Sequence, residues 1–200
     1  MPTGVHIRDA RQQLFDAAER VLLRDGASAL TSRAVTVEAG CAKGVLHRHF
    51  ADFDAFLVEL VQDRIARVED QAAALRASAG TGTVAGNLAG ALADLFDSIA
   101  VAIVSLVIFR DELRVRLRRT GPAHGFPVLA EAGAMIASYL ADERELGRIA
   151  ADADVDSLSL SLIGAGHLLF AGREGAPPDA GAVDKVVATV IADAVQRRLL

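Results

Sequence analysis

Cysteine and aromatic residues are scarce in this 200-residue sequence. Cys41 is the single cysteine, which excludes an internal disulfide and suits a reducing compartment. Tryptophan is absent and tyrosine occurs once, so the 52% of hydrophobic residues consists mainly of alanine, leucine and valine. This composition favours helices and is ample for a sizeable core. We therefore expect an all-α protein of one or two domains.

Long hydrophobic runs are also absent. The longest, residues 99–109, has about half of the roughly 20 residues that a membrane-spanning helix needs. We interpret it as a buried core helix. Met1 is not followed by the basic and then apolar segments of a signal peptide. These observations predict a cytoplasmic protein with no membrane partner.

The sequence contains none of the common patterns of catalytic, phosphate-binding or metal sites. His47 and His49 are two residues apart on a predicted helix, so they point away from each other and do not share a metal. Cys41 is explained as a small apolar residue in a turn. We expect no enzyme, no cofactor and no metal. A helical enzyme with an unrecognised site is an alternative that two perturbed titratable groups in one pocket would favour.

Positive charge is not in excess. The formal net charge is −5 at pH 7, and acidic and basic residues nearly balance over the first 60 residues. Phosphate contact requires lysine or arginine on one face rather than a basic total. Any binding to nucleic acid must therefore depend on a few well-placed cations and be sensitive to salt.

What the sequence does contain is a pattern of two short helices in residues 30–56, LTSRAVTVEAGCAKGVLHRHFADFDAF. Thr31 or Ser32 is available as the N-cap of the first. Gly40 stands where the chain must reverse, because glycine reaches positive φ without a steric penalty. We expect a tight turn at this glycine.

The second short helix has one apolar side. Leu46 and Phe50 are four residues apart and share a face, which leaves Lys43, His47 and Arg48 on other faces. Two helices across a short turn, the second with cationic side chains outward, form the helix-turn-helix pattern that places a recognition helix in the major groove of DNA.

The same segment resembles the signature of the tetracycline-repressor (TetR) family of transcriptional regulators, LT-x-x-x-I-A-x-x-A-G-V-S-x-G-x-L-Y-x-H/Y-F-x-x-K-x-x-L. The resemblance is close over residues 8–60 and weak over the remainder. The residues in register with the signature are Leu30, Thr31, Val35, Ala39, Gly40, Lys43, Gly44, Leu46, His49, Phe50 and Phe56.

The resemblance implies an N-terminal three-helix head that binds DNA. Lys43 and the exposed face of the second short helix enter the major groove, and Gly44 lets the helix backbone approach the duplex. The expected DNA-binding residues are Thr31, Ser32, Arg33, Ala42, Lys43, Gly44, His47, Arg48 and His49.

The sequence departs from the family pattern at four positions. Ala42 replaces the usual serine, so the second short helix lacks a side-chain N-cap, which costs about 1 kcal/mol. His47 replaces tyrosine, Phe53 replaces lysine and Cys41 replaces valine. The family's tyrosine and lysine typically touch phosphates. A helical small-molecule sensor or binding protein with a degenerate DNA-binding head is therefore an alternative.

We expect two domains, a helix-turn-helix DNA-binding domain over residues 1–51 and a helical ligand-binding and dimerisation domain over residues 52–200. Clusters of glycine and proline at 80–83, 120–125 and 173–178 separate the helical patterns of the second. The expected helices outside the short pair are 7–25, 52–79, 87–119 as two helices with a break near 98–101, 127–146, 155–172 and 179–200.

The last two helices have more apolar surface than one small domain needs. This favours a two-fold interface in which they form a four-helix bundle with a second copy, and the resemblance implies the same homodimer. Burial within one chain is the alternative. A dimer would read a palindromic operator whose half-sites lie about one helical turn of DNA, or a multiple of it, apart.

An apolar pocket with a few polar anchors is the default small-molecule site. The residues expected to line one, which could equally be ordinary core, are Phe96, Phe109, Arg110, Met135 and Tyr139. We predict a repressor released from its operator by an unknown effector that binds there and favours one spacing of the two heads.

Overall fold

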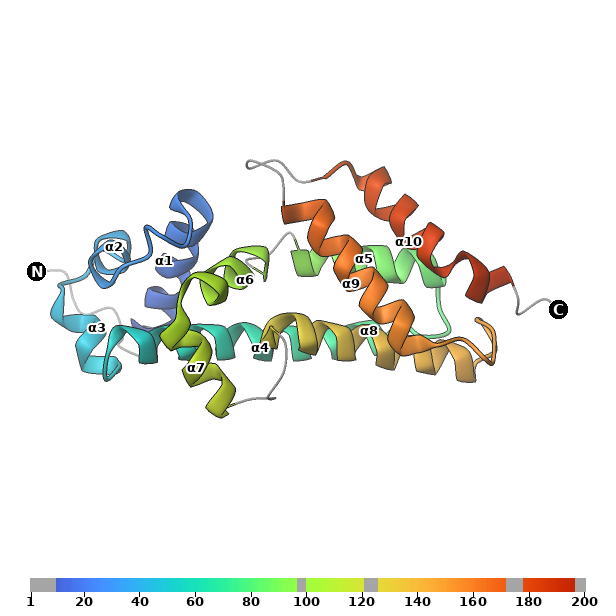
Figure 1. Ribbon diagram of the computed structural model, residues 1–200, viewed down its shortest axis with the longest axis horizontal. Helices are drawn as coiled ribbons and strands as arrows, with labels where there is room; N and C mark the ends of the chain where they lie inside the picture. Colours follow the sequence, from blue (N-terminus) through green and yellow to red (C-terminus); the bar gives the residue numbers. More distant parts are fainter. Residues whose placement is uncertain (1–9, 97–99, 121–125, 172–177, 197–200) are drawn as a thin grey trace, which may run out of the picture. The chain divides into compact units, whose positions relative to one another are not determined.

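A computed structural model of the protein describes residues 10–96, 100–120, 126–171 and 178–196 (Figure 1). Every regular element within these ranges is a helix, and no strand occurs in them. The predicted all-α fold class is confirmed.

The chain forms two compact units. Unit 1 comprises residues 1–63 and 102–123, and unit 2 comprises residues 64–101 and 124–200. Two helices, α4 (Phe53–Ala77) and α6 (Ala100–Phe109), have residues in both units. The domain boundary expected between residues 51 and 52 stays a prediction.

The remaining helices of unit 1 are α1 (Ala10–Asp25), α2 (Ser32–Glu38), α3 (Gly44–His49) and α7 (Asp111–Thr120). Within this unit, α2 packs against α1 and contacts α3. The three-helix head that the sequence predicts is therefore present, with α2 and α3 as its two short helices.

Unit 2 is built mainly from longer helices. They are α5 (Val84–Phe96), α8 (Pro127–Glu145), α9 (Val155–Ala171) and α10 (Ala180–Gln196). Helix α9 packs against α5, α8 and α10, and α5 also contacts α8 and α10 (Figure 1). The apolar faces of these helices meet in one core.

The ends of several helices are fixed by residues that the sequence singles out. The side-chain oxygens of Thr31, Asp52 and Asp154 each accept a hydrogen bond from the backbone amide three residues later, at 3.1, 2.6 and 3.1 Å. Pro127 is the first residue of α8, where its missing amide hydrogen costs nothing. Gly26, after α1, has a φ of 81° and ends that helix.

One prediction about helix boundaries is wrong. Residues 87–119 were expected to form two helices, but the chain forms α5, α6 and α7, with a second break at Arg110. Asp111 and Glu112 occupy the first turn of α7, where acidic residues suit the helix dipole, so the sequence did contain a signal for this break. Residues 97–99, near the first predicted break, lie outside the described part of the chain.

The longest apolar run lies in α6 and is a core helix, as expected. Five of its side chains are buried, namely Ala100, Ile103, Val104, Leu106 and Val107. Among the described residues, no single helix is long and apolar enough to cross a membrane, although α5 and α6 would reach that length and composition if taken together.

Candidate functional site

The head has an aromatic core. The ring of Phe56 lies 5.6 Å from that of Phe15, 5.0 Å from Phe50 and 5.6 Å from Phe53. Phe56 is fully buried, and Leu46 of α3 is buried with it. Because these rings come from α1, the end of α3 and the start of α4, they hold the short helix α3 against two longer ones.

The turn between α2 and α3 has the predicted geometry. Gly40 has a φ of 64°, a conformation that other residues adopt only at a cost. The amide of Cys41 donates to the carbonyl oxygen of Thr36 at 3.0 Å, which closes the turn. Cys41 is half-buried beside it, which agrees with its interpretation as a small turn residue.

Helix α3 presents a polar surface. Leu46 is its buried residue, whereas Gly44, His47 and Arg48 are exposed, as is Lys43, which immediately precedes the helix. No side chain caps its N-terminus, in agreement with the replacement of serine by Ala42. The rigidity of α3 therefore comes from packing behind it rather than from its own ends.

Most arginines of α1 are neutralised by acidic partners. Arg20 and Arg24 both bind Glu38 of α2, at 2.8 and 2.9 Å, and their hydrogen bonds hold the pKa of Glu38 below its usual value. Arg11 pairs with Glu59 of α4.

In contrast to the arginines of α1, the cations on α2, on α3 and in the turn between them have no acidic partner among the described residues. Arg33, Lys43, His47 and Arg48 are exposed, and none of their side chains forms an ion pair or a hydrogen bond with any residue that the structure describes. The head is close to neutral as a whole because its acidic residues balance the arginines of α1. Its unbalanced positive charge is concentrated on the surface formed by α2 and α3.

The other predicted DNA-binding residues surround this surface. Thr31 is exposed and uses its hydroxyl as the cap of α2, and Ala42 is exposed in the turn. The hydroxyl oxygen of Ser32 is covered by protein and has no hydrogen-bond partner among the described residues. His49 is half-buried, and its carbonyl oxygen accepts a hydrogen bond from Arg11 at 3.3 Å.

Helix α7 is attached to the head by two arginines. Arg110 donates to the carbonyl oxygen of Leu30, immediately before α2, at 2.5 Å, and lies 5.3 Å from the ring of Phe53. Arg116 binds both carboxylate oxygens of Asp52 at 2.9 and 3.1 Å. Together with the amide of the α4 N-terminus, this guanidinium keeps the pKa of Asp52 below its usual value. Arg110 was expected to line a ligand pocket, and the structure places it here.

The five residues predicted to line a pocket do not all belong to the same unit. Phe109 and Arg110 belong to unit 1, and Phe109 is 78% exposed. Phe96, Met135 and Tyr139 are buried in unit 2. None of the five lines the cavities described below, so their role in ligand binding stays a prediction.

Tyr139 belongs to a buried polar network. Its hydroxyl donates to Glu143 at 2.6 Å, and Glu143, which is fully buried, also lies 3.3 Å from the Nε atom of Arg148. Asn87 donates to the Tyr139 hydroxyl at 3.0 Å. Burial and the neighbouring carboxylate raise the pKa of Tyr139. The network ties the start of α5 to the end of α8, and the sequence offered no signal for it beyond a buried tyrosine.

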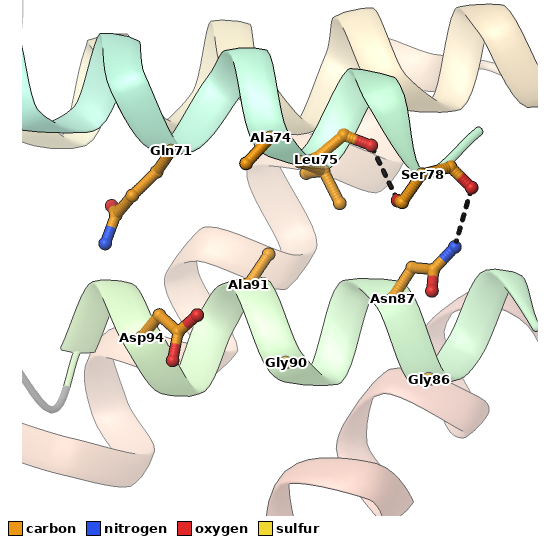
Figure 2. Close-up of a pocket in the computed structure, with 9 residues that line it drawn as sticks. All are labelled: Gln71, Ala74, Leu75, Ser78, Gly86, Asn87, Gly90, Ala91 and Asp94. Carbon is orange, nitrogen blue, oxygen red and sulfur yellow. Dashed lines mark hydrogen bonds between the residues drawn. The ribbon is translucent and has the colours of Figure 1, made fainter. Parts of the chain in front are cut away.

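A large open groove lies between α4 and α5 (Figure 2). Its volume is about 330 Å³, and small residues form much of its floor. At one end Asn87 donates to the carbonyl oxygen of Ser78 at 3.3 Å, and at the other Gln71 and Asp94 extend from the two facing helices.

A smaller and more enclosed cavity of about 160 Å³ lies nearer the N-terminal end of α4, along the same face of that helix. Gln71 lines both this cavity and the groove. The full lining is Arg64, Arg67, Val68 and Gln71 from α4, Leu95 from α5, Ala100 from α6 and Val128 from α8. Nowhere in the described part of the chain do three or more histidine, cysteine or acidic residues gather as metal ligands would.

Comparison with known proteins agrees with this architecture. Residues 14–60 match the family described as bacterial regulatory proteins, tetR family. No curated protein matches the chain. Among solved structures, a transcriptional regulator from Rhodococcus sp. Rha1 has a TM-score of 0.68 at 16% identity, over 92% of this chain and 97% of that one.

Two further structures share the fold. FadR from Bacillus subtilis, in complex with stearoyl-CoA, has a TM-score of 0.64 at 17% identity, over 91% of this chain and 98% of that one. The multidrug binding protein EbrR, complexed with imidazole, has a TM-score of 0.56 at 22% identity, over 90% of this chain and 93% of that one. The resemblance seen in the sequence is thereby confirmed: residues 14–60 match the model of the tetR family, and the chain shares its overall fold with these transcriptional regulators.

Proposed function

We propose that the protein is a homodimeric repressor that binds a palindromic DNA operator through α3 and leaves it when a small molecule binds unit 2. The observation that carries the DNA-binding part is the group of exposed cations on α2 and α3 without partners in the described structure, next to arginines on α1 that are neutralised. A cation with no internal partner is available to phosphates and base edges.

The proposed mode of binding places α3 in the major groove. Lys43 and Arg48 reach phosphates or base edges, and Gly44 allows close approach of the helix backbone. The remaining proposed contacts are Thr31, Ser32, Arg33, Ala42, His47 and His49. Each phosphate contact releases counterions, so binding weakens as salt rises, and because few cations take part the dependence on salt is modest.

The proposed dimer uses α9 and α10. Leu160 and Leu168 of α9 are 75% and 77% exposed, and Gly164 lies between them on the same face with open space around it. Large exposed leucines at this spacing favour burial against a second copy of the helix. Two heads related by a two-fold axis would match an operator with the same symmetry.

The effector part of the proposal is supported by the cavities next to α4, and by the fact that the similar structures of FadR and EbrR are described with stearoyl-CoA and imidazole bound. A ligand changes DNA affinity only if it binds the two states of the protein unequally. A regulator of this kind needs no catalytic activity and works in the cytoplasm.

The operator is tested by selection. Purified full-length protein is incubated with a pool of random DNA duplexes, and bound sequences are recovered and enriched. The proposal expects an inverted repeat with half-sites about one helical turn, or a multiple of it, apart. Failure of any duplex to be enriched would favour the alternative of a sensor with a degenerate head.

The dimer is tested by replacing the exposed leucines. Leu160→Glu and Leu168→Glu should convert the dimer to a monomer in light scattering, because each places a charge in an apolar interface. Leu23→Glu, at an exposed leucine of α1, is the control and should leave the mass unchanged. A wild-type protein that is monomeric would contradict the homodimer.

A further inference from the structure

The groove between α4 and α5 is lined by two matching stripes of residues (Figure 2). On each helix the lining residues follow one another at steps of three or four positions, so they share one face. Each stripe is polar at both ends and small or apolar in the middle. The stripe of α4 is Gln71, Ala74, Leu75 and Ser78, and that of α5 is Asn87, Gly90, Ala91 and Asp94, with Gly86 beside Asn87.

The polar ends of the two stripes meet in pairs. At one end Ser78 and Asn87 lie together, because the Nδ2 atom of Asn87 donates to the Ser78 carbonyl oxygen at 3.3 Å. At the other end Gln71 and Asp94 extend from the two facing helices (Figure 2). Asn87 and Asp94 are two helical turns apart, which separates the two ends of the groove by about 10 Å along α5.

Both ends of the groove offer hydrogen-bond acceptors. The Nδ2 atom of Asn87 also donates to the Thr81 carbonyl oxygen and the Tyr139 hydroxyl, each at 3.0 Å, whereas the Oδ1 atom of Asn87 has no partner in the described chain. Asp94 is exposed, and its carboxylate bonds to no described residue. The same holds for the side-chain amide of Gln71. A ligand with donors at both of its ends would therefore find acceptors at both ends of the groove.

The charge in the groove is negative. Of the nine residues that line it in the described structure, Asp94 alone is charged. Arg67, one turn before Gln71 on α4, lines the neighbouring cavity and not the groove. The net charge of −5 on the whole chain also favours cations. A primary ammonium group suits such a site, because it has three donors and no acceptor.

The middle of the groove suits a slender apolar chain. Ala74, Gly90 and Ala91 have little or no side chain, and the buried Leu75 completes the apolar lining. The volume of about 330 Å³ is near the lower end of the range of ligand sites, which is about 300–1,000 Å³. A chain of methylene groups fits the space between the two polar ends.

We propose that the groove between α4 and α5 binds a linear diamine, with one ammonium group at Asp94 and Gln71, the other at Asn87, and the methylene chain over the small residues between them. This inference rests on the proposed function, because it takes the diamine to be the effector that alters DNA binding. It names a class of ligand and a site that involve none of the five pocket residues expected from the sequence.

A series of diamines tests the span of the groove. Isothermal titration calorimetry on the full-length protein compares tetramethylenediamine, which is too short to reach both ends, with hexamethylenediamine and octamethylenediamine. The better of the two longer diamines should bind about tenfold more tightly than the shortest, since it gains a second charge-assisted hydrogen bond. Octylamine, with one ammonium group, and octamethylene glycol, with none, should bind more weakly than octamethylenediamine. Affinities that do not depend on length, or no binding of any diamine, would overturn the proposal.

Matched variants test the charge. Asp94→Asn should weaken binding of the best diamine about fivefold or more, because it removes the carboxylate from the groove. Asp184→Asn, at an exposed position of α10, removes the same charge outside the groove and should leave the affinity unchanged. Equal losses in both variants would mean that the diamine responds only to the net charge of the protein, and would overturn the site.

A blocking variant tests the space. A Cβ atom at Gly90 would have no other atom within 4 Å, so Gly90→Leu should remain folded and fill the middle of the groove with its side chain. It should abolish diamine binding without lowering the melting temperature, because leucine is a better helix former than glycine. Ala73→Leu adds a side chain to α4 outside the groove and should keep the wild-type affinity. Wild-type affinity in Gly90→Leu would overturn the site, and Asp94→Asn decides the question if Gly90→Leu does not fold.

The operator duplex separates this inference from the proposed function. DNA binding is measured first without ligand and then with the best diamine at saturation. Because diamines also compete for DNA phosphates, Gly90→Leu is titrated in parallel. The operator affinity of wild type should change by more than that of Gly90→Leu. Absence of DNA binding without ligand would contradict the proposed function and leave the measured diamine site in place. Equal changes in the two proteins would overturn the effector role of the groove alone.

Discussion

Unit 1 and unit 2 are both built of helices, but the helices are held in place in different ways. In unit 1, short helices are held by a cluster of four phenylalanine rings and by capping side chains. In unit 2, longer helices enclose the groove and the cavity described above and bury charged groups such as Arg64 and Glu143.

The difference agrees with what the proposed function requires of each unit. A DNA duplex has a fixed groove, so a head that reads it benefits from side chains held in one position by dense packing. A ligand-binding unit must leave space unfilled, which reduces dispersion contacts until a ligand restores them. Under the proposed function, unit 2 responds to a ligand and unit 1 keeps its own geometry.

The largest effect is expected at the buried charge of unit 2. Glu143→Ala removes the partner of Tyr139 and Arg148 and should destabilise the protein by about 3–5 kcal/mol, as breaking a buried pair does. Glu145→Ala, at an exposed position of the same helix, should stay within about 0.5 kcal/mol of wild type. Urea unfolding followed by circular dichroism measures the free energy of unfolding of both variants. Equal losses would show that the buried network does not stabilise the protein more than an exposed side chain does.

A smaller effect is expected where α9 approaches α5. A Cβ atom at Gly166 would lie 2.5 Å from the ring of Phe96, and that ring is stacked on Phe170, so it cannot move freely. Gly166→Ala should therefore cost about 1–3 kcal/mol. Gly90→Ala, with no atom near its Cβ, should instead stabilise α5 by about 0.5–1 kcal/mol.

Melting temperatures of the two alanine variants should shift in opposite directions. Equal shifts would mean that unit 2 is packed too loosely for close approach to matter. The contrast with the dense core of unit 1 would then be larger than the structure indicates.

A modest gain is expected in the head. Ala42→Ser supplies the side-chain N-cap that α3 lacks and should stabilise unit 1 by about 0.5–1 kcal/mol. Ala51→Ser, at an exposed position that does not cap α3, should have no comparable effect. Thermal unfolding measures the difference, and no gain in Ala42→Ser would show that packing alone already fixes α3.

The smallest effect concerns pH. The amide of Ala55 and the Arg116 guanidinium lower the pKa of Asp52 in the folded state, so its charge stabilises the protein above the unfolded pKa of 3.8. That contribution is lost as pH falls through the lower folded pKa. Asp52→Asn keeps a cap but not the charge, and its melting temperature should fall below that of wild type at pH 7 and approach it near pH 3. A constant difference would exclude the charge as the cause.

The parts of the molecule that the sequence predicted are local ones. Thr31, Gly40 and Asp52 act on residues within four positions of themselves, so their roles as caps and turn could be derived from the order of residues. The helix-turn-helix head is built from such signals, which is why its helices were placed correctly.

The parts that the sequence missed depend on residues far apart in the chain. Arg110 lies 80 residues from Leu30, whose carbonyl oxygen it binds. The residues around Arg110 in the sequence give no signal of that contact. The cavity at Arg64 requires four helices to meet, so periodicity along one helix could not reveal it. An arginine on an otherwise apolar face of α4 is the one signal that could have drawn attention there.

The central claim is that the unneutralised cations of α3 contact DNA. The direct test is the salt dependence of operator affinity, measured by fluorescence anisotropy for wild type, Lys43→Ala and Arg48→Ala. Each variant should bind more weakly and lower the slope of log affinity against log salt by about 0.9 for each phosphate that is no longer neutralised. Arg24→Ala, whose guanidinium is already paired with Asp25 and Glu38, should keep the wild-type slope. Wild-type slopes in both α3 variants, or an equal reduction in Arg24→Ala, would contradict the claim.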